Sequence, residues 1–234
     1  GKRMTQFKKL SGAVDPEIKA DENGEHYLSQ TNSIIKAGTV KLGEGVKRYT
    51  IRNATNLQGT PYLKVKSAAG KRIDMYTDTW LESAGNGNSV RHAYITKDGE
   101  QEFEALGWVN GYDVYFEIPE SVEVIELGFR PSTYNTTPAG SFTSEDEDLN
   151  LLYKKSYDTL LVTMRDNYMD CPDRERAQWW GDAVNEMQMA FYAMDSNAGL
   201  LYKKALNQVL GWKNAAGQLP TTAPNGIDAI SELP

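Results

Sequence analysis

Alternation of apolar and polar residues runs through several short segments of the first 140 positions, and this period of two predicts β-strands. The clearest candidates lie at 62–66, 72–76, 90–94, 113–118 and 121–129. In the last segment, Ile125, Leu127 and Phe129 repeat at every second position, so we expect them to share one face. A turn is predicted at Ala69-Gly70, and Lys97-Asp98-Gly99 is predicted to be a hairpin turn. Many short strands at this spacing are typical of an antiparallel β-sandwich.

The apolar period changes after Gly140 to the spacing of α-helices. Ser144 and Glu147 have the spacing of a capping box, so a first helix is expected to begin there and to end before Asp170. Two further helices are predicted at about 180–194 and 200–212. Residues at helical spacing are Leu149, Leu152, Tyr153, Ser156, Tyr157, Leu160 and Met164 in the first helix and Leu201, Ala205, Leu206 and Val209 in the third. In the second helix, the side expected to be buried carries Ala183, Met187, Ala190, Phe191 and Met194.

These two patterns predict an α+β chain of two domains. We expect an antiparallel β-sandwich at 1–140 and a helical domain at 141–234. Three helices are few for an independent all-α domain, so the helical part is interpreted as the beginning of a larger one. Apolar helix faces left uncovered in this way are too large for water, so self-association through helices 145–212 is expected.

Composition narrows the possible partners. The net charge of −7 argues against general nucleic-acid binding, which needs a basic face. No run of eighteen apolar residues is present, so no membrane span is expected. Cys171 is the only cysteine, which excludes an internal disulfide and a thiolate metal cluster, and no metal or cofactor is expected. Composition leaves the compartment open. If a leader has been removed ahead of Gly1, a periplasmic or secreted location is favoured over a cytoplasmic one.

Candidate chemistry is concentrated in the fourteen residues 170–183, where carboxylates, guanidiniums and two indoles lie between two predicted helices. The four carboxylates of this segment cannot all be ionised in one cleft at low cost, so at least one pKa should be raised. They are Asp170, Asp173, Glu175 and Asp182. A carboxylic acid kept neutral in this way can protonate a leaving oxygen. Trp179 and Trp180 offer flat faces to the C–H side of a sugar ring. The mixture suits a sugar-processing pocket.

Simpler interpretations apply to the same residues. Asp182 fits a role that only caps or charges a helix start. Arg174 and Arg176 fit plain ion pairs with Asp166 and Asp170. One of the two tryptophans is expected in the core, and Cys171 is expected to be a small buried apolar residue. His26 and His92 are isolated, and structural roles are expected for both.

The turn resembles the signature of bacterial α-L-rhamnosidases of glycoside hydrolase family 78. That signature is an Asp-Cys-Pro-x-Arg-Glu segment followed by a Trp and then an Asp. It is matched here by Asp170, Cys171, Pro172, Arg174, Glu175, Trp179 and Asp182. The approach at 140–150 is similar to the entry into the family's helical barrel. The upstream β region resembles its accessory sandwich.

The resemblance implies an (α/α)6 barrel, whose first helices would lie in 141–234, and inverting release of terminal α-L-rhamnose. It implies that Glu175 is the general acid and that Asp170 and Asp182 bind rhamnose hydroxyls. Arg174 and Trp179 would line the same subsite. The family's general base is a Glu much farther downstream, so no residue of this chain is assigned that role.

The sequence departs from the family where the usual Gly-Trp-Thr is Gln178-Trp179-Trp180, which leaves the sugar open. Two alternatives therefore stand beside a rhamnosidase. One is a carbohydrate-binding or adaptor module without catalysis, in which the turn is structural. The other is a related α/α-barrel glycosidase that acts on another sugar.

Overall fold

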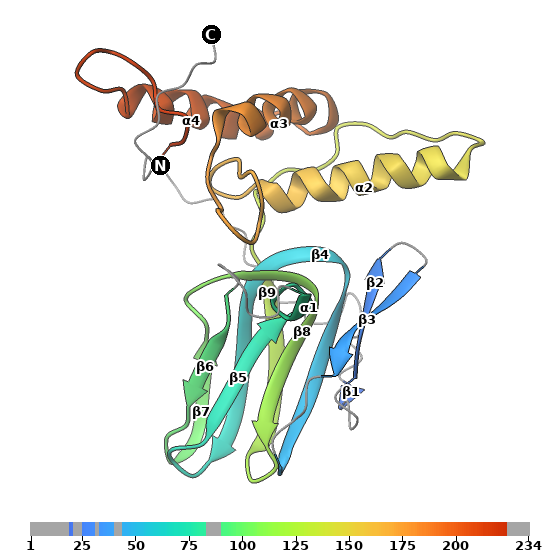
Figure 1. The fold of residues 1–234 in the computed structure, drawn as a ribbon, viewed down its shortest axis with the longest axis vertical. Helices are drawn as coiled ribbons and strands as arrows, with labels where there is room; N and C mark the ends of the chain where they lie inside the picture. The colour runs from blue at the N-terminus through green and yellow to red at the C-terminus, as the bar shows by residue number, and fades with distance from the viewer. Residues whose placement is uncertain (1–18, 21–24, 31–32, 40–43, 83–89, 224–234) are drawn as a thin grey trace. The chain divides into compact units, whose positions relative to one another are not determined.

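A computed structural model of the chain describes residues 19–20, 25–30, 33–39, 44–82 and 90–223 (Figure 1). The chain divides into two compact units, with the boundary between Ser132 and Thr133. This is a few residues before the predicted change at Gly140. Residues 1–18 of the predicted β domain and the tail beyond 223 lie outside the described part.

The β unit is built around one curled antiparallel sheet of seven strands (Figure 1). Its central path is β1-β4-β8-β5-β6, while β7 and β9 both pair with β4; β2 and β3 pair only with each other. The bounds are β1 Lys19–Ala20, β2 Glu25–Gln30, β3 Ser33–Thr39, β4 Val46–Ser67, β5 Arg72–Thr77, β6 His92–Ile95, β7 Gly99–Glu104, β8 Val109–Pro119 and β9 Glu123–Pro131. The predicted antiparallel strands are confirmed, and their division into a two-sheet sandwich stays a prediction.

Strand β4 joins the two parts of this sheet because it changes partners at Gly59. The preceding residues pair with β8 and the following residues with β9, and Gly59 itself is aligned with both Val109 and Pro131. A Cβ atom on Gly59 would lie 2.3 Å from the carbonyl oxygen of Arg130, so only glycine fits this crossing. Ile51 and Leu63, on either side of the crossing, belong to one buried apolar cluster.

Two strand predictions need correction. Ile125 does not share the buried face of Leu127 and Phe129, because its side chain is 43% exposed. The β4–β9 register shifts between Lys64 and Val65, and a shift of one residue turns side chains to the other face. The turn at 97–99 does not join a hairpin, because β6 pairs with β5 and β7 pairs with β4.

Four helices are described. The short α1, Asp78–Glu82, belongs to the β unit; α2, α3 and α4 span Glu147–Thr163, Trp180–Ala193 and Ala198–Gly211. The α2 N-cap is Asp146, whose carboxylate accepts the amides of Asp148 and Leu149, so the predicted capping box at Ser144 is wrong. A carboxylate that satisfies two free amides displaces the hydroxyl two residues earlier. None of the described helices is long and apolar enough to cross a membrane.

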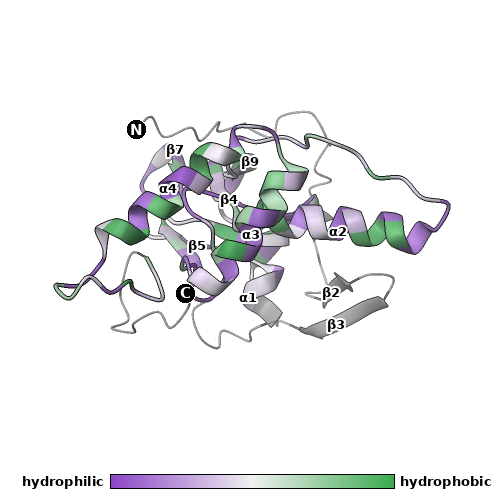
Figure 2. Cartoon of the chain, turned by 90° about the horizontal axis from the view of Figure 1, so that it is seen from above, coloured by the Kyte–Doolittle hydropathy of each residue, from purple (hydrophilic) through white to green (hydrophobic). Residues whose placement is uncertain are grey.

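The helical unit has its own core, to which α2, α3 and α4 each contribute. Leu160, Met187 and Leu201 are almost completely buried in it. Phe191, expected on the buried side of its helix, is instead 80% exposed, and Leu149, Leu152 and Leu206, at helical spacing in their helices, are 45%, 62% and 42% exposed. Figure 2 shows apolar residues over much of α3 and α4. The helical spacing was correct, and the apolar faces are wider than the core that covers them.

Candidate active site

The charged turn is a loop between α2 and α3 that closes on itself through Asp170. The amide of Met169 donates to the carbonyl of Thr163 at the end of α2 (3.0 Å). The amide of Asp170 then donates to the carbonyl of Ala177 (3.0 Å), and the amide of Ala177 donates to Asp170 Oδ1 (3.0 Å). Residues 171–176 are therefore held as one excursion with fixed ends.

Arg176 reverses the chain inside this loop. Its φ is +55°, in the left-handed region that a side chain other than glycine rarely adopts. Its Nε donates to the carbonyl of Asp173 (3.0 Å), and burial lowers the pKa of its guanidinium. An observed outlier of this kind is common where a fold holds functional groups in place. Arg176 thus has a shaping role, and its ion pair with Asp166 or Asp170 stays a prediction.

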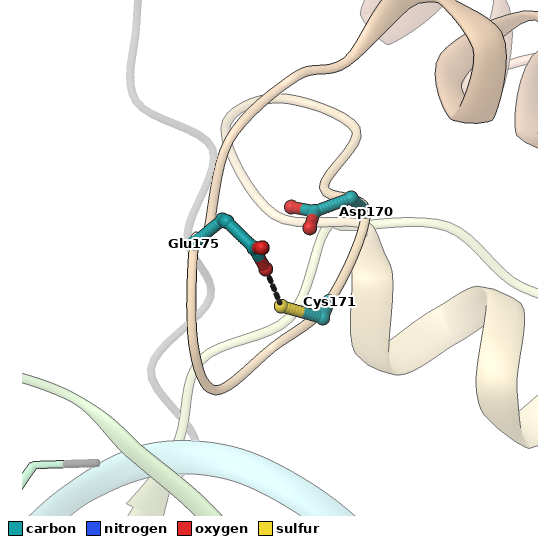
Figure 3. Close-up of side chains that lie close together, drawn as sticks. All are labelled: Asp170, Cys171 and Glu175. Carbon is teal, nitrogen blue, oxygen red and sulfur yellow. Dashed lines mark hydrogen bonds between the residues drawn. The ribbon is translucent and has the colours of Figure 1, made fainter. Parts of the chain in front are cut away.

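Asp170, Cys171 and Glu175 converge in the loop (Figure 3). One potential ligand atom from each lies within 4.8 Å of the others, so this set has the spacing to hold a cation. The thiol of Cys171 donates to Glu175 Oε2 (3.2 Å). Cys171 is only partly buried and is a polar neighbour of the carboxyl, so its predicted place as an apolar core residue is wrong.

The pKa values of the three groups in this cluster shift in different directions. Glu175 has its pKa lowered to about 2, chiefly by the ion pair with Arg174 and then by Cys171 and Asp170. Asp170 has its pKa raised, chiefly by burial. Burial also raises the pKa of the Cys171 thiol. The expectation of a carboxyl with raised proton affinity is therefore met at Asp170, while Glu175, the residue assigned as acid, is held ionised.

A depression of about 490 Å³ opens over the loop. It is lined by Asp170, Cys171, Asp173, Arg174, Glu175, Trp179 and Asp182. Asp182 is in the first turn of α3, where the helix dipole favours a negative charge, and the N-cap residue Trp179 makes no side-chain capping bond. The structure therefore brings five of the six predicted site residues together.

Trp180 is the exception, because it lies in the core of the helical unit and is 9% exposed. It is the first residue of α3, and adjacent residues on a helix point in different directions, so it turns away while Trp179 stays at the depression. This corrects its predicted sugar-binding role and fulfils the expectation that one of the two tryptophans is buried.

Glu186 is a nearby carboxyl that sequence reasoning missed. Burial, with smaller effects of Asp182 and Asp170, raises its pKa to about 8. The available signal was its position four residues after Asp182, which places both carboxyls on one side of α3. In the sequence it reads as an ordinary polar position between Ala183 and Met187.

The helical part of the chain matches a known protein family. Residues 137–234 match the family profile described as the bacterial alpha-L-rhamnosidase 6 hairpin glycosidase domain. No curated protein matches the sequence.

Three solved structures are similar in fold. A family 78 rhamnosidase of Bacillus sp. GL1 is 20% identical with a TM-score of 0.64, over 86% of this chain and 20% of that one. A rhamnosidase from Klebsiella oxytoca, solved with rhamnose bound, is 12% identical with a TM-score of 0.70, over 97% and 48%. An α-L-rhamnosidase from Dictyoglomus thermophilum is 20% identical with a TM-score of 0.55, over 79% and 22%.

The resemblance to bacterial α-L-rhamnosidases is thus confirmed. The chain spans less than half the length of each of these three structures.

Proposed function

We propose that this chain, whose residues 137–234 match a rhamnosidase six-hairpin domain, is part of an inverting glycoside hydrolase that releases terminal α-L-rhamnose. One observation carries the proposal. Asp170, Glu175 and Asp182, which match the family signature in spacing, line one depression together with the indole of Trp179. Carboxylates beside an aromatic face form the kind of site that holds a polar ring and transfers a proton.

Each side chain has a role in this proposal. Glu175 protonates the glycosidic oxygen as the bond breaks. Asp170 and Asp182 accept hydrogen bonds from sugar hydroxyls, and Trp179 packs on the apolar side of the ring. Arg174, whose side chain is 68% exposed, contacts the sugar from the outer edge. An inverting reaction also needs a carboxylate about 6.5–9.5 Å from the acid to activate water. That base is expected from the rest of the whole protein.

Because its pKa is lowered, Glu175 must gain a proton before it can act as the general acid. The main cause of the lowered pKa is the ion pair with Arg174, which is adjacent in sequence and exposed, and exposed pairs of this kind are weak. We infer that substrate draws Arg174 away from Glu175. A proton shared within the Asp170–Glu175 pair is then available to Glu175, because closely interacting carboxyls titrate as a unit.

The test is a comparison of leaving groups with the full-length protein. Glu175→Gln should reduce turnover of rhamnosides with poor leaving groups by about 10²–10⁴-fold, as is typical when an acid catalyst is lost. Activated aryl rhamnosides should be affected much less, because a good leaving group needs little protonation. Asp170→Asn should weaken binding and turnover together, because its hydroxyl contacts exist in both the ground state and the transition state.

The pH dependence of the rate checks the assignment. Native enzyme should lose activity on its basic limb as the acid deprotonates, and Glu175→Gln should lack that limb. A variant that keeps the basic limb and loses equally on good and poor leaving groups would show that another group is the acid.

Sugar binding without catalysis is a second candidate, and the ionised state of Glu175 favours it. A protein that binds rhamnose with unchanged affinity in Glu175→Gln, and that turns over neither substrate type, would have this function. A third candidate is hydrolysis of another sugar. Gln178 favours it, because this residue departs from the family signature and is 1% exposed with neither side-chain amide atom hydrogen-bonded within the described residues. A substrate screen separates it from a rhamnosidase.

A further inference from the structure

The chain that follows α4 returns to the start of α3 and pairs with the segment that carries Trp179. Trp179 and Thr222 form an antiparallel β-bridge. Two backbone hydrogen bonds flank the bridge, from the amide of Trp180 to the carbonyl of Thr221 (2.9 Å) and from the amide of Ala223 to the carbonyl of Gln178 (3.2 Å). Residues 221–223 therefore join the site from a distant part of the sequence.

The opposite edge of the same segment is bonded to Asp170. The amide of Ala177 donates to Asp170 Oδ1, and the carbonyl of Ala177 accepts from the amide of Asp170, both at 3.0 Å. Successive residues of an extended segment direct their backbone groups to opposite edges. Residues 177–180 are thus held from both edges, by the charged loop on one and by residues 221–223 on the other.

The pairing also provides the cap at the start of α3. The N-cap residue Trp179 makes no side-chain capping bond, and the first amides of a helix have no partner within the helix. The carbonyl of Thr221 accepts one of them, the amide of Trp180. The direction in which α3 leaves the loop, with Trp179 at its start, is therefore set in part by Thr221.

Thr222 lies directly opposite Trp179. The two flanking bonds make Trp179 and Thr222 a pair without hydrogen bonds between its own members, and in such a pair the Cα atoms are about 4.5 Å apart with their side chains on one side. Trp179 lines the depression and Thr222 does not, and Thr222 is only 2% exposed. The threonine side chain is thus placed beside the indole and away from the opening.

The shape of Thr222 matters more here than its hydroxyl. Within the described residues, this hydroxyl is buried and makes no hydrogen bond. A β-branched side chain is stiff, and it packs well against an aromatic side chain across a strand pair. An apolar side chain of the same shape should therefore serve equally well, because no hydrogen bond is lost.

We propose that Thr222 is a positioning residue whose side chain supports the indole of Trp179 at the depression. The backbone bonds of residues 221–223 fix where Trp179 lies, and the stiff side chain of Thr222 limits the orientations of the indole. The connection to sugar rests on the proposed function of Trp179. The pairing that defines the role does not depend on it.

The test uses nuclear magnetic resonance of the 234-residue chain, in which the indole signal of Trp179 is identified by its loss in Trp179→Phe. In the native chain, we expect a nuclear Overhauser contact between the Thr222 methyl group and this indole. Thr222→Ala should shift and broaden the indole signal, whereas Thr222→Val should keep it sharp. Val209→Ala, an equal truncation of a buried residue on α4, should leave the signal unchanged.

Absence of the methyl–indole contact would overturn the proposal, and this measurement needs no variant to fold. An indole signal unchanged in Thr222→Ala, or equally disturbed in Thr222→Val, would also overturn it. Binding of L-rhamnose is measured in parallel, and affinity should fall several-fold in Thr222→Ala and be retained in Thr222→Val. The expected indole signals in a chain that binds no rhamnose would leave the positioning role standing and count against the proposed function.

Discussion

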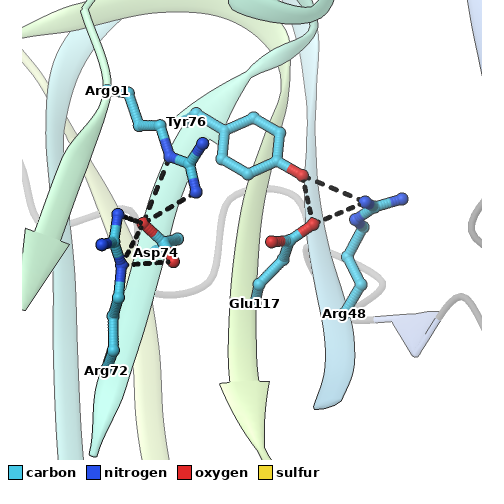
Figure 4. A network of polar contacts seen from close by, with 6 residues as sticks. All are labelled: Arg48, Arg72, Asp74, Tyr76, Arg91 and Glu117. Carbon is cyan, nitrogen blue, oxygen red and sulfur yellow. Dashed lines mark hydrogen bonds and ion pairs between the residues drawn. The ribbon is translucent and has the colours of Figure 1, made fainter. Parts of the chain in front are cut away.

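Ionisable side chains are partnered differently in the two units. In the β unit, arginines and acids form a set of closed ion pairs across β4, β8 and β5 (Figure 4). In the helical unit, the pKa values of Asp170 and Glu186 are raised and that of Glu175 is lowered. Both sets hold several ionisable groups within a few ångströms.

The β-unit network is organised around Arg48, which is completely buried. Its Nη2 lies 2.7 Å from Glu117 Oε1 and donates to the hydroxyl of Tyr76 (3.0 Å). Tyr76 in turn donates to Glu117. Beside them, Asp74 accepts hydrogen bonds from both Arg72 and Arg91. Every acid in this figure therefore faces a cation.

The charged side chains of the sheet have the features of a structural network, and those of the loop have the features of a functional site. Glu117 and Asp74 meet fixed guanidiniums in a continuous sheet, an arrangement that locks geometry. Asp170 and Glu175 are brought together in the loop, where the exposed Arg174 pairs with Glu175, and the pKa of Asp170 is raised while that of Glu175 is lowered. Shifted pKa values in a surface depression are typical of functional sites, whereas ion pairs within a sheet usually have a structural role.

The largest effect on stability should come from opening the β-unit network. Arg48→Met should leave Glu117 without its counter-charge and the Tyr76 hydroxyl without its guanidinium donor, so the free energy of unfolding should fall by about 3 kcal/mol. Urea unfolding followed through the β-sheet signal measures the change. Arg48→Met with Glu117→Leu should recover most of the loss, because an apolar pair leaves no buried charge. A double variant no more stable than the single one would show that the network contributes more than its charges.

Stability of the helical unit should decrease as the pH rises, because of Glu186. Its pKa is about 8 in the folded chain and 4.5 without the fold, so between these values the folded state binds more protons than the unfolded state. Stability therefore falls from pH 4.5 to 8 and levels off above. We expect a decline of about 2 kcal/mol, below the full linkage value because the carboxyl is partly accessible. Unfolding followed by circular dichroism at 222 nm should show a flatter pH profile for Glu186→Gln than for Glu147→Gln.

A smaller effect is expected on self-association, which should depend on the helical unit and not on the β unit. Phe191 and Tyr192 on α3 and Leu210 on α4 are exposed and border an apolar groove of about 1120 Å³. We propose that the isolated chain associates through this surface, as apolar patches of this size tend to. Phe191→Ser should weaken association about tenfold, since it removes one large apolar contact. Sedimentation at several concentrations measures it, with Leu106→Ser, fully exposed in the β unit, as the control.

The smallest effect is expected at an exposed pair of the β unit. Lys64 on β4 and Glu100 on β7 form an ion pair of 2.8 Å, which raises the pKa of Lys64 and lowers that of Glu100. Exposed pairs contribute little, so Lys64→Gln should leave the urea midpoint unchanged within error. A clear loss of stability would mean that surface pairs also hold this sheet, and the contrast with Arg48 would be weakened.

Local periodicity predicted the elements well. The helices at 180–194 and 200–212 appear as α3, Trp180–Ala193, and α4, Ala198–Gly211, because apolar spacing is a property of the nearby sequence. The pairing of the strands was harder to predict from the sequence. The partners of β6 and β7 and the register shift that exposes Ile125 depend on residues far away in sequence.

The candidate site was predictable for a different reason. Asp170, Glu175 and Asp182 are carried by one short turn, so their sequence spacing already indicates their proximity. What escaped prediction depends on packing. Trp180 turns into the core as α3 begins, Arg174 pairs with Glu175, and partial burial raises the pKa of Glu186. The sequence around each residue allows these outcomes but does not select them, because packing by more distant residues decides them.

The continuity of β4 has a consequence for how the β unit forms. One strand of 22 residues pairs with β1, β7, β8 and β9, so none of these pairings is completed without it. Its contact with β8 joins Arg48 to Glu117, which are 69 positions apart. Contacts between such distant positions slow folding, because the intervening chain must close before they form. We expect the β unit to fold cooperatively and later than the helices, with Gly59 as the point from which pairing proceeds in both directions.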